Sequence, residues 1–132
     1  MNEEPYFLLQ FDGGAQPNPG AGAGGAVLFG PDGVVIGESY ERYAHCTNNY
    51  AEYQGLIMGL EMALLHGVRR LRIEGDSMLV IQQIQGKWKI KAEGLLELYT
   101  EAKRLMDQFE ALEIRHIPRA LNSHADRLTR KI

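Results

Sequence analysis

The alternation of apolar and polar stretches predicts that the chain opens with three strands. Residues 6–11 form a nearly continuous apolar run, which is typical of a strand covered on both faces. Two more strand-like segments follow at 21–30 and 34–43, separated by the turn sequence Gly-Pro-Asp-Gly at 30–33. We expect residues 13–20, which are rich in glycine and proline, to form a loop. Short connections of this kind predict an antiparallel meander.

The remainder of the chain predicts alternating helices and strands. Apolar residues recur at helical spacing over 49–66, directly after the capping candidates Thr47 and Asn48. Gly55 and Gly59 share one face of this helix, and the missing side chains would let it approach the sheet closely. The other expected elements are a strand at 70–75, a short helix from Ser77 to Ile84, a loop at 85–91, a helix at 93–109, a strand at 112–117, a loop at 118–121 and a terminal helix from Asn122 or Ser123. This order, βββαβααβα, predicts a single α/β domain over residues 1–132.

Composition agrees with a compact globular protein. The chain has 132 residues, of which 45% are hydrophobic and 23% charged, an ordinary mixture for one domain with a core of its own. The net charge of -3 argues against a general attraction to nucleic acid but allows a local basic face. Cys46 is the only cysteine, and no apolar run is long enough to span a bilayer. We therefore expect a cytoplasmic monomer with no membrane partner.

Four acidic residues stand at or beside predicted junctions between a strand or loop and a helix. They are Asp12, Glu52, Asp76 and Asp126. Each has an ordinary structural explanation when taken alone, as a turn residue, a helix cap or an acid favoured by a helix dipole. Together they offer oxygen ligands from several elements, a set that selects Mg²⁺ or Mn²⁺ over zinc. Because divalent metals held by carboxylates commonly serve phosphoryl transfer, the pattern predicts a metal-dependent nuclease.

The short motifs around these acids resemble those of the type 1 ribonuclease H family. The matching segments are Phe11-Asp12-Gly13-Gly14 with Asn18-Pro19-Gly20, Thr47-Asn48-Asn49-x-Ala51-Glu52, Gly75-Asp76-Ser77 and Asn122-x-x-Ala125-Asp126-x-Leu128. Each motif is a weak signal singly, but all four occur in the family's order across almost the whole chain. The segment at 86–91, Gly-Lys-Trp-Lys-Ile-Lys, resembles the compact form that lacks an inserted basic helix.

The resemblance implies a fold, a reaction and a set of substrate contacts. The fold would be a five-stranded mixed sheet in the order 3-2-1-4-5 with helices on both faces. The reaction would be hydrolysis of the RNA strand of an RNA–DNA hybrid, with two Mg²⁺ or Mn²⁺ ions held by the four acids and with 5′-phosphate and 3′-hydroxyl products. The candidate substrate-binding residues are Gly13, Gly14, Asn18, Thr47, Asn48 and Asn122.

A lysine-rich segment is a further candidate for substrate contact. If residues 87–91 are extended, Lys87, Lys89 and Lys91 fall on one side, and Trp88 and Ile90 fall on the other. One interpretation is a solvated loop with an anchored aromatic residue, and the other is a basic rail for the phosphates of the DNA strand. The sequence leaves both open. By contrast, we expect the arginines at 69, 70 and 72 to form a solvated edge.

Two departures from the family pattern affect substrate choice. His45 stands where many members carry an arginine, and Ala92 falls where related chains carry a phosphate-binding asparagine. Both changes should weaken the grip on DNA phosphates, so double-stranded RNA stays open as an alternative substrate, as does a catalytically silent RNA-binding module. Some members place a mobile histidine in the loop before the last acid. Here His116 is predicted within a strand, and His124 in the terminal helix is the candidate near the site.

Overall fold

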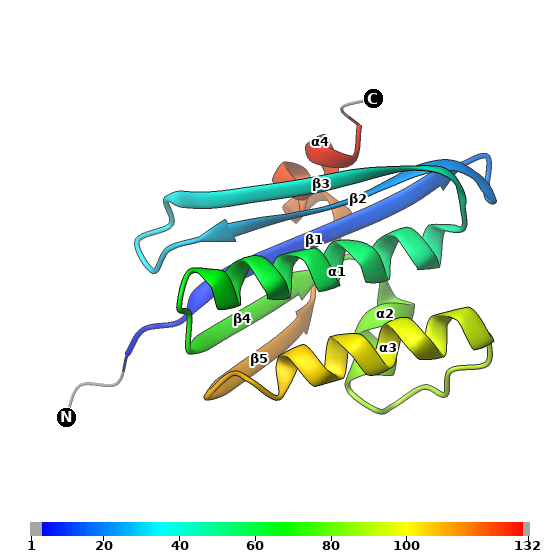
Figure 1. Ribbon diagram of the computed structural model, residues 1–132. Helices are drawn as coiled ribbons and strands as arrows, with labels where there is room; N and C mark the ends of the chain where they lie inside the picture. The colour runs from blue at the N-terminus through cyan, green and yellow to red at the C-terminus, as the bar shows by residue number, and fades with distance from the viewer. Residues whose placement is uncertain (1–3, 131–132) are drawn as a thin grey trace.

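The computed structural model describes residues 4–130 and contains a five-stranded sheet in the order β3-β2-β1-β4-β5 (Figure 1). The first three strands, β1 (Phe7–Gln16), β2 (Gly20–Phe29) and β3 (Val35–Cys46), form the expected antiparallel meander. β4 (Arg70–Gly75) pairs in parallel with β1, and β5 (Ala111–His116) pairs in parallel with β4. The predicted mixed sheet and its strand order are confirmed.

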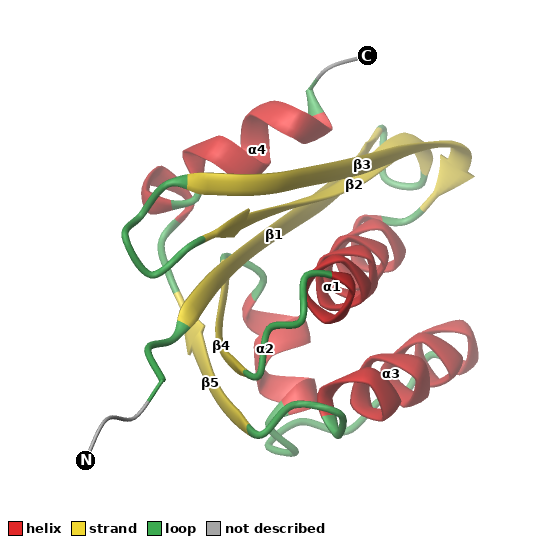
Figure 2. Cartoon of the chain, turned by 60° about the vertical axis from the view of Figure 1, so that its left-hand side comes forward, coloured by secondary structure: helices red, strands yellow, loops and turns green. Residues whose placement is uncertain are grey.

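Helices cover both faces of the sheet (Figure 2). α1 (Asn48–Leu65), α2 (Met78–Ile84) and α3 (Glu93–Met106) lie on one face, and α4 (Ser123–Thr129) lies on the other against β1 and β2. The Thr47 hydroxyl accepts a hydrogen bond from the Tyr50 N–H at 3.1 Å, so the predicted N-cap of α1 is confirmed. Within residues 4–130, none of these helices is both long and apolar enough to cross a membrane.

β1 continues further than its sequence pattern predicts. We expected a loop at 13–20, but β1 runs to Gln16, because its pairing with β2 continues from Asp12↔Gly25 to Gln16↔Ala21. The ladder hydrogen bonds to β2 override the poor strand propensity of the two glycines. Asp12 therefore lies within a strand and not at its end. Pairing between β1 and β4 stops at Phe11↔Gly75, which leaves the β4 side of Asp12 open.

The other differences from the expected elements are small and lie at element ends. α3 ends at Met106, three residues early, because the chain turns there and the Gln108 and Phe109 N–H groups bond to the carbonyls of Leu105 and Met106. β5 begins and ends one residue earlier than expected. A short 3₁₀ helix, η1 (Arg119–Leu121), occupies the expected loop at 118–121. None of these shifts changes the topology.

A close contact between α1 and the sheet fixes the position of the helix. A Cβ atom at Gly55 would lie 2.8 Å from the Gly25 carbonyl oxygen, and one at Gly59 would lie 2.6 Å from a methyl group of Leu9. Both distances are too short for a side chain, so the expected role of these glycines is confirmed. The main core lies between this face of the sheet and the helices α1, α2 and α3. It includes Leu9, Phe11, Leu56, Leu60, Leu71, Ile73, Val80 and Ile84.

Candidate metal and nucleic-acid site

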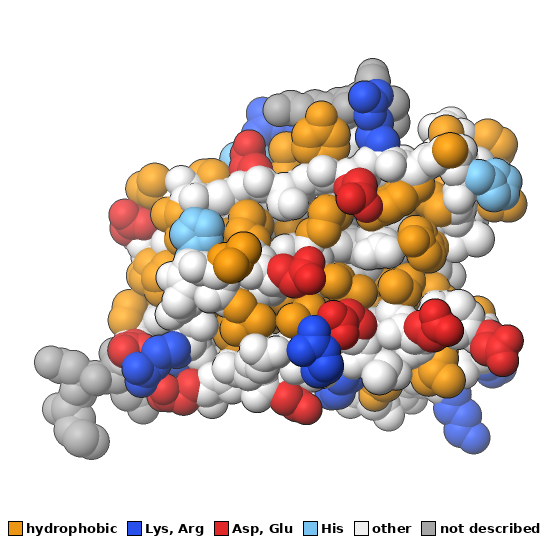
Figure 3. Space-filling model, viewed as in Figure 1, with side chains coloured by type: hydrophobic (Ala, Val, Ile, Leu, Met, Phe, Trp, Pro, Cys, Tyr) orange, Lys and Arg blue, Asp and Glu red, His pale blue; other side chains and the backbone are white. Residues whose placement is uncertain are grey.

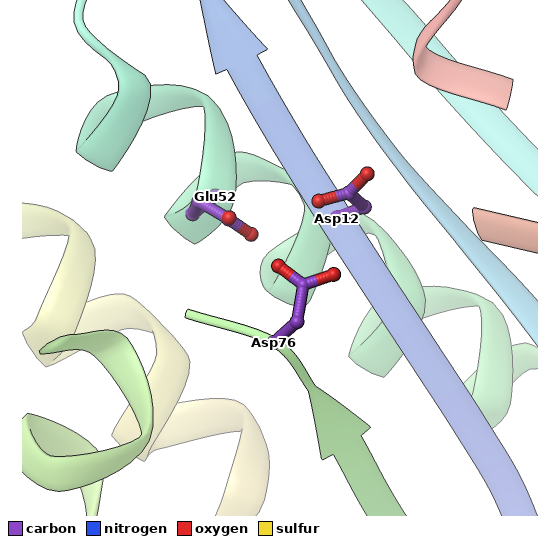
Figure 4. A group of neighbouring side chains, drawn as sticks. All are labelled: Asp12, Glu52 and Asp76. Carbon is purple, nitrogen blue, oxygen red and sulfur yellow. The ribbon is translucent and has the colours of Figure 1, made fainter. Parts of the chain in front are cut away.

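Three carboxylates from three different elements converge beside the open edge of β1 (Figure 4). Asp12 comes from β1, Glu52 from the second turn of α1, and Asp76 from the residue directly after β4. Each offers one oxygen, and these oxygens all lie within 4.8 Å of one another. We call this group the three-carboxylate cluster. Its members are separated by at least 24 residues of sequence, so only the sheet and the helix packing bring them together.

Gly13 and Gly14 serve different purposes in this arrangement. A Cβ at Gly13 would overlap the Ala51 carbonyl group and the Glu52 nitrogen. The absence of that side chain lets the start of α1 rest on β1 and brings Glu52 next to Asp12. At Gly14, the nearest atom to an added Cβ would be the Asn48 Oδ1, at 3.7 Å, in ordinary contact. Gly14 therefore leaves space above the site, and neither glycine forms a turn.

The cluster is electrostatically unfavourable when no cation is bound. Asp12 is 6% exposed and Glu52 is 7% exposed. Burial, followed by the charge of Asp76, raises the pKa of Asp12 to about 7. Burial also raises the pKa of Glu52 well above its usual value, and the charges of Asp12 and Asp76 add to this effect. A bound cation would reverse these shifts by stabilising the ionised carboxylates.

The donor set fits a hard divalent cation. The three-carboxylate cluster offers oxygen atoms alone, as Mg²⁺ and Mn²⁺ prefer. The Glu52 Oε1 is buried, and it has no hydrogen-bond partner among residues 4–130. A buried carboxylate oxygen without a partner is costly, and a metal ion would remove that cost. The geometry therefore supports the predicted type of ligand.

Asp126, the fourth predicted ligand, lies at the rim of the same site. It lines the cavity that holds the three-carboxylate cluster, and its proximity contributes to the raised pKa of Asp12. Its Oδ2 lies 3.2 Å from the Arg130 Nε, and it stands outside the group of converging oxygens. The reason is its position on α4, which packs on the opposite face of the sheet from α1.

The acids share a cavity of about 670 Å³ with several residues that the sequence did not single out. Gly13, Gly14 and Asn48 line it, as predicted candidates. The additional lining residues with polar side chains are Gln16, Asn49, Ser77, Arg119, Thr129 and Arg130. Arg119 also opposes the raised pKa of Glu52 through its charge. The signal that we overlooked was the pair of arginines flanking the fourth motif, which place positive charge beside the acids.

Asn18 and Asn48 tie the start of α1 to the strands below it. The Asn48 Oδ1 accepts a hydrogen bond from the Ala15 N–H at 2.7 Å, and the Asn18 Oδ1 accepts one from the Asn48 N–H at 3.0 Å. Of these two, Asn48 lines the carboxylate cavity. Asn18 and Thr47 lie outside its lining and act on the site through the backbone of α1. A substrate contact for either of them remains a prediction.

The structure does not fit our prediction that Asn122 contacts the substrate. Asn122 is 0% exposed. Its side-chain amide donates to the Phe11 carbonyl at 2.8 Å and to the Asp76 Oδ2 at 3.0 Å. Asn122 thus links the end of η1 to β1 and orients the Asp76 carboxylate. It is a positioning residue, buried because the chain before α4 passes beside Phe11, where the pairing of β1 with β4 stops.

His124 lies differently from our expectation, whereas His116 lies within a strand, as predicted. The His124 Nε2 is 2.6 Å from the Glu38 Oε2 on β3, and its ring meets the Phe29 ring edge to face at 5.7 Å. His124 does not line the carboxylate cavity, because the first turn of α4 points it toward β3. His116, at the end of β5, lies closer to the acids, with its Nε2 3.2 Å from the Asp76 carbonyl oxygen.

The lysine-rich segment lines a second cavity of about 560 Å³. Lys87, Trp88, Lys89 and Lys91 all border it, and Asn49 borders both cavities. The alternation of Trp88 and the lysines that we expected for an extended segment does not apply, since residues 87–91 do not form a regular strand. Trp88 is 49% exposed, and Ile90 instead packs against the core.

The face that carries α1 and α3 shows no broad basic patch among the residues that the structure describes (Figure 3). On the side that carries α1 and α3, acidic and basic side chains are interspersed (Figure 3). Arg69 and Arg72 pair with Glu110 at 2.9 Å and Glu113 at 2.8 Å, in agreement with a solvated edge. Positive charge that faces a cavity is contributed by the lysines of the second cavity and by Arg119 and Arg130 beside the acids.

The mixed sheet with carboxylates converging at the ends of β4 and α1 defines a ribonuclease H-like class of protein. Residues 10–132 match the family described as "Reverse transcriptase-like". The "Bifunctional protein Rv2228c" of Mycobacterium tuberculosis is 42% identical over 122 residues, which are 92% of this chain and 34% of that protein. "Ribonuclease HI" of Halobacterium salinarum is 39% identical over 118 residues, 89% of this chain and 59% of that protein.

Two solved structures are closely similar to the chain. The N-terminal RNase H domain of Rv2228c from Mycobacterium tuberculosis, solved as a fusion with maltose binding protein, has a TM-score of 0.93 at 40% identity and covers 96% of this chain and 92% of that one. LC11-RNase H1 in complex with an RNA/DNA hybrid has a TM-score of 0.89 at 32% identity, covering 95% and 94%. The chain belongs to the type 1 ribonuclease H family. It spans about a third of the length of the mycobacterial relatives that it matches.

Proposed function

We propose that this chain is a metal-dependent endonuclease that hydrolyses the RNA strand of RNA–DNA hybrids. The observation that carries the proposal is the three-carboxylate cluster, in which three buried or half-buried acids converge. The buried Glu52 Oε1 has no hydrogen-bond partner among residues 4–130 that would offset its burial. Membership of the type 1 ribonuclease H family supports it, as does the hybrid in the similar structure of LC11-RNase H1. The products would carry 5′-phosphate and 3′-hydroxyl ends.

The acids would act by holding two Mg²⁺ or Mn²⁺ ions. Asp12 and Asp76 would be the ligands most central to both ions, with Glu52 completing the cluster and Asp126 lining the same cavity. Divalent ions bound in such a site would lower the pKa of the attacking water and neutralise the negative charge that develops on the leaving 3′-oxygen. Asn122 holds the Asp76 carboxylate in place through its bond to Oδ2, which limits the reorganisation needed on binding.

Substrate recognition would use both cavities. Gly14, Asn48 and Asn49 line the carboxylate cavity at the N-terminus of α1, where backbone N–H groups favour phosphate and where a 2′-hydroxyl group can be sensed. The second cavity, with Lys87 and Lys89 beside the exposed ring of Trp88, suits the phosphates of the DNA strand. Asn49 borders both cavities and would lie between the two strands.

Double-stranded RNA is a second candidate substrate, and one observation favours it. Ala92 lines the second cavity and offers no side-chain hydrogen bond there. Recognition of the partner strand as DNA would then rest on fewer contacts, so discrimination against duplex RNA is looser. A catalytically silent binding module would not need the four acids around one cavity. We also expect a reducing, cytoplasmic setting, because the thiol of Cys46 is free.

A cleavage assay with five labelled substrates tests the proposal. Hybrid, duplex RNA, duplex DNA and both single strands are incubated with the purified chain and Mg²⁺ or Mn²⁺, and the ends of the products are mapped. We expect hybrid cleavage, and a loss of about 100-fold or more in Asp12→Asn and Asp76→Asn, because a charged ligand is removed. Glu97→Gln, which removes an exposed charge on α3, is the matched control. Undiminished cleavage by either folded site variant would refute the assignment.

A further inference from the structure

β3 forms a long and exposed edge of the sheet. It has 12 residues, against six in β5 at the opposite edge. β2 pairs with one side of β3, and no strand of residues 4–130 pairs with the other (Figures 1 and 2). The strand also exposes Val35, Ile36 and Tyr40 by 37%, 39% and 45%. Unpaired backbone groups on such an edge are a template for pairing with another chain.

We propose that β3 pairs with β3 of a second copy, antiparallel and centred on Tyr40, so that two sheets join into one. In this register Glu38 lies opposite Arg42 of the second copy, and the two-fold axis generates the same pair again. Ser39, whose hydroxyl group donates to the Met58 Sδ of its own chain at 3.7 Å, lies opposite Glu41. The two Tyr40 rings meet at the axis. Both charged residues are exposed, so the pairs form without burying an isolated charge.

The charges select this register over its neighbours. A two-fold axis perpendicular to the sheet keeps each face on its own side, so the pairing must centre on a residue. Centring on Glu38, Glu41 or Arg42 places like charges directly opposite one another, which is destabilising. Centring on Ser39 places Glu38 opposite Tyr40 and leaves every charge without a partner. The register centred on Tyr40 is the one in which opposite charges meet.

The groups that this interface needs are available. Arg42 has no ion-pair partner within residues 4–130. The Glu38 Oε2 binds His124 within its own chain at 2.6 Å, and the Oε1 remains for Arg42 of the second copy. In Figures 1 and 2, α1 and α3 lie on the inner side of β3, and α4, which is drawn beside β3, packs chiefly against β2 and β1. No residue of β3 lines the carboxylate cavity, so pairing leaves both sites open. We expected a monomer from the sequence, and the experiment below tests that expectation against the dimer.

Sedimentation equilibrium over a range of concentrations, with charge-reversed variants, tests the pairing. We expect a monomer–dimer equilibrium in the unmodified chain. Glu38→Arg and Arg42→Glu should each weaken it by about 10- to 100-fold, because two attractive cross-strand pairs become repulsive. The double variant carrying both reversals should dimerise again, since the pairs are restored with their signs exchanged. Amide exchange should show new protection at alternate residues of β3 in the dimer.

The remaining arms separate edge pairing from other causes. His124→Ala removes the internal partner of Glu38 and should leave dimerisation unchanged. Hybrid cleavage per chain should also persist in the charge-reversed variants, because no residue of β3 lines the carboxylate cavity. An unmodified chain that stays monomeric at the highest attainable concentration would overturn the proposal. So would a double variant that fails to recover, or a dimer that His124→Ala abolishes, since either places the contact elsewhere.

Discussion

Replacing Asp12 by asparagine should stabilise the metal-free protein while it removes activity. The buried Asp12 carboxylate, with Asp76 beside it, has a pKa raised from 3.8 to about 7. The folded protein therefore holds a proton at Asp12 more tightly than the unfolded chain does. Stability contributed by this proton is present at low pH and is lost as the pH rises through about 7. Asparagine resembles the protonated acid in shape and carries no charge, so it avoids this loss.

The size of the effect follows from the pKa difference. Each pH unit corresponds to about 1.36 kcal/mol, so ionised Asp12 costs up to about 4 kcal/mol in the free energy of unfolding at pH 8. The advantage of Asp12→Asn should shrink to about 2 kcal/mol at pH 5 and vanish below about pH 4. Near the melting temperature, each kcal/mol corresponds to roughly 3–5 °C for a domain of this size.

Urea denaturation between pH 5 and pH 8, with a chelator present, measures this difference. Glu97→Gln removes the same charge from an exposed position on α3 and should leave the pH dependence unchanged. Adding Mg²⁺ should reverse the order of stability, because an ion bound only by the native state adds RT ln(1 + [L]/Kd), and the asparagine variant binds it less well. If Asp12→Asn shows the same pH slope as the unmodified chain, the carboxylates do not repel one another as we have argued.

Three further experiments test other parts of the structure. Gly55→Ala should destabilise the fold by about 1–3 kcal/mol in thermal denaturation, because its Cβ would meet backbone atoms of β1 and β2. Gly94→Ala, at the exposed start of α3, is the control and should stabilise the fold by about 0.5–1 kcal/mol. Equal effects of the two substitutions would contradict the close contact between α1 and the sheet. Asn122→Ala should lower the free energy of unfolding by about 1–3 kcal/mol. It should also lower kcat by misplacing Asp76, with KM nearly unchanged. A change confined to KM would instead indicate that Asn122 contacts the substrate. Ala92→Asn combined with His45→Arg should raise the ratio of hybrid to duplex-RNA cleavage, and a ratio that does not move would show that these positions do not face the DNA strand.

Local sequence patterns determined the elements and the identity of the candidate ligands. The cap at Thr47 and the apolar spacing after it placed α1 to within one residue at each end. The strand at 70–75 was predicted with its observed bounds. These features depend on residues that are neighbours in the chain, and the acids stand in short motifs that can be read without a structure. The order of the motifs was also sufficient for the family and the strand order.

Contacts between distant residues decided the rest. The sequence of β1 predicts a loop after Phe11, and only pairing with β2 keeps Asp12 inside a strand. Asn122 is 111 residues from Phe11, and its burial against that carbonyl could not be inferred from its motif. The same holds for His124, which is drawn to Glu38 on β3 and away from the acids. Which acids converge, and which side chains face the cavity between them, depends on how α1, α4 and the sheet pack. That packing is a property of the whole fold, because each contact joins elements that the local pattern treats separately.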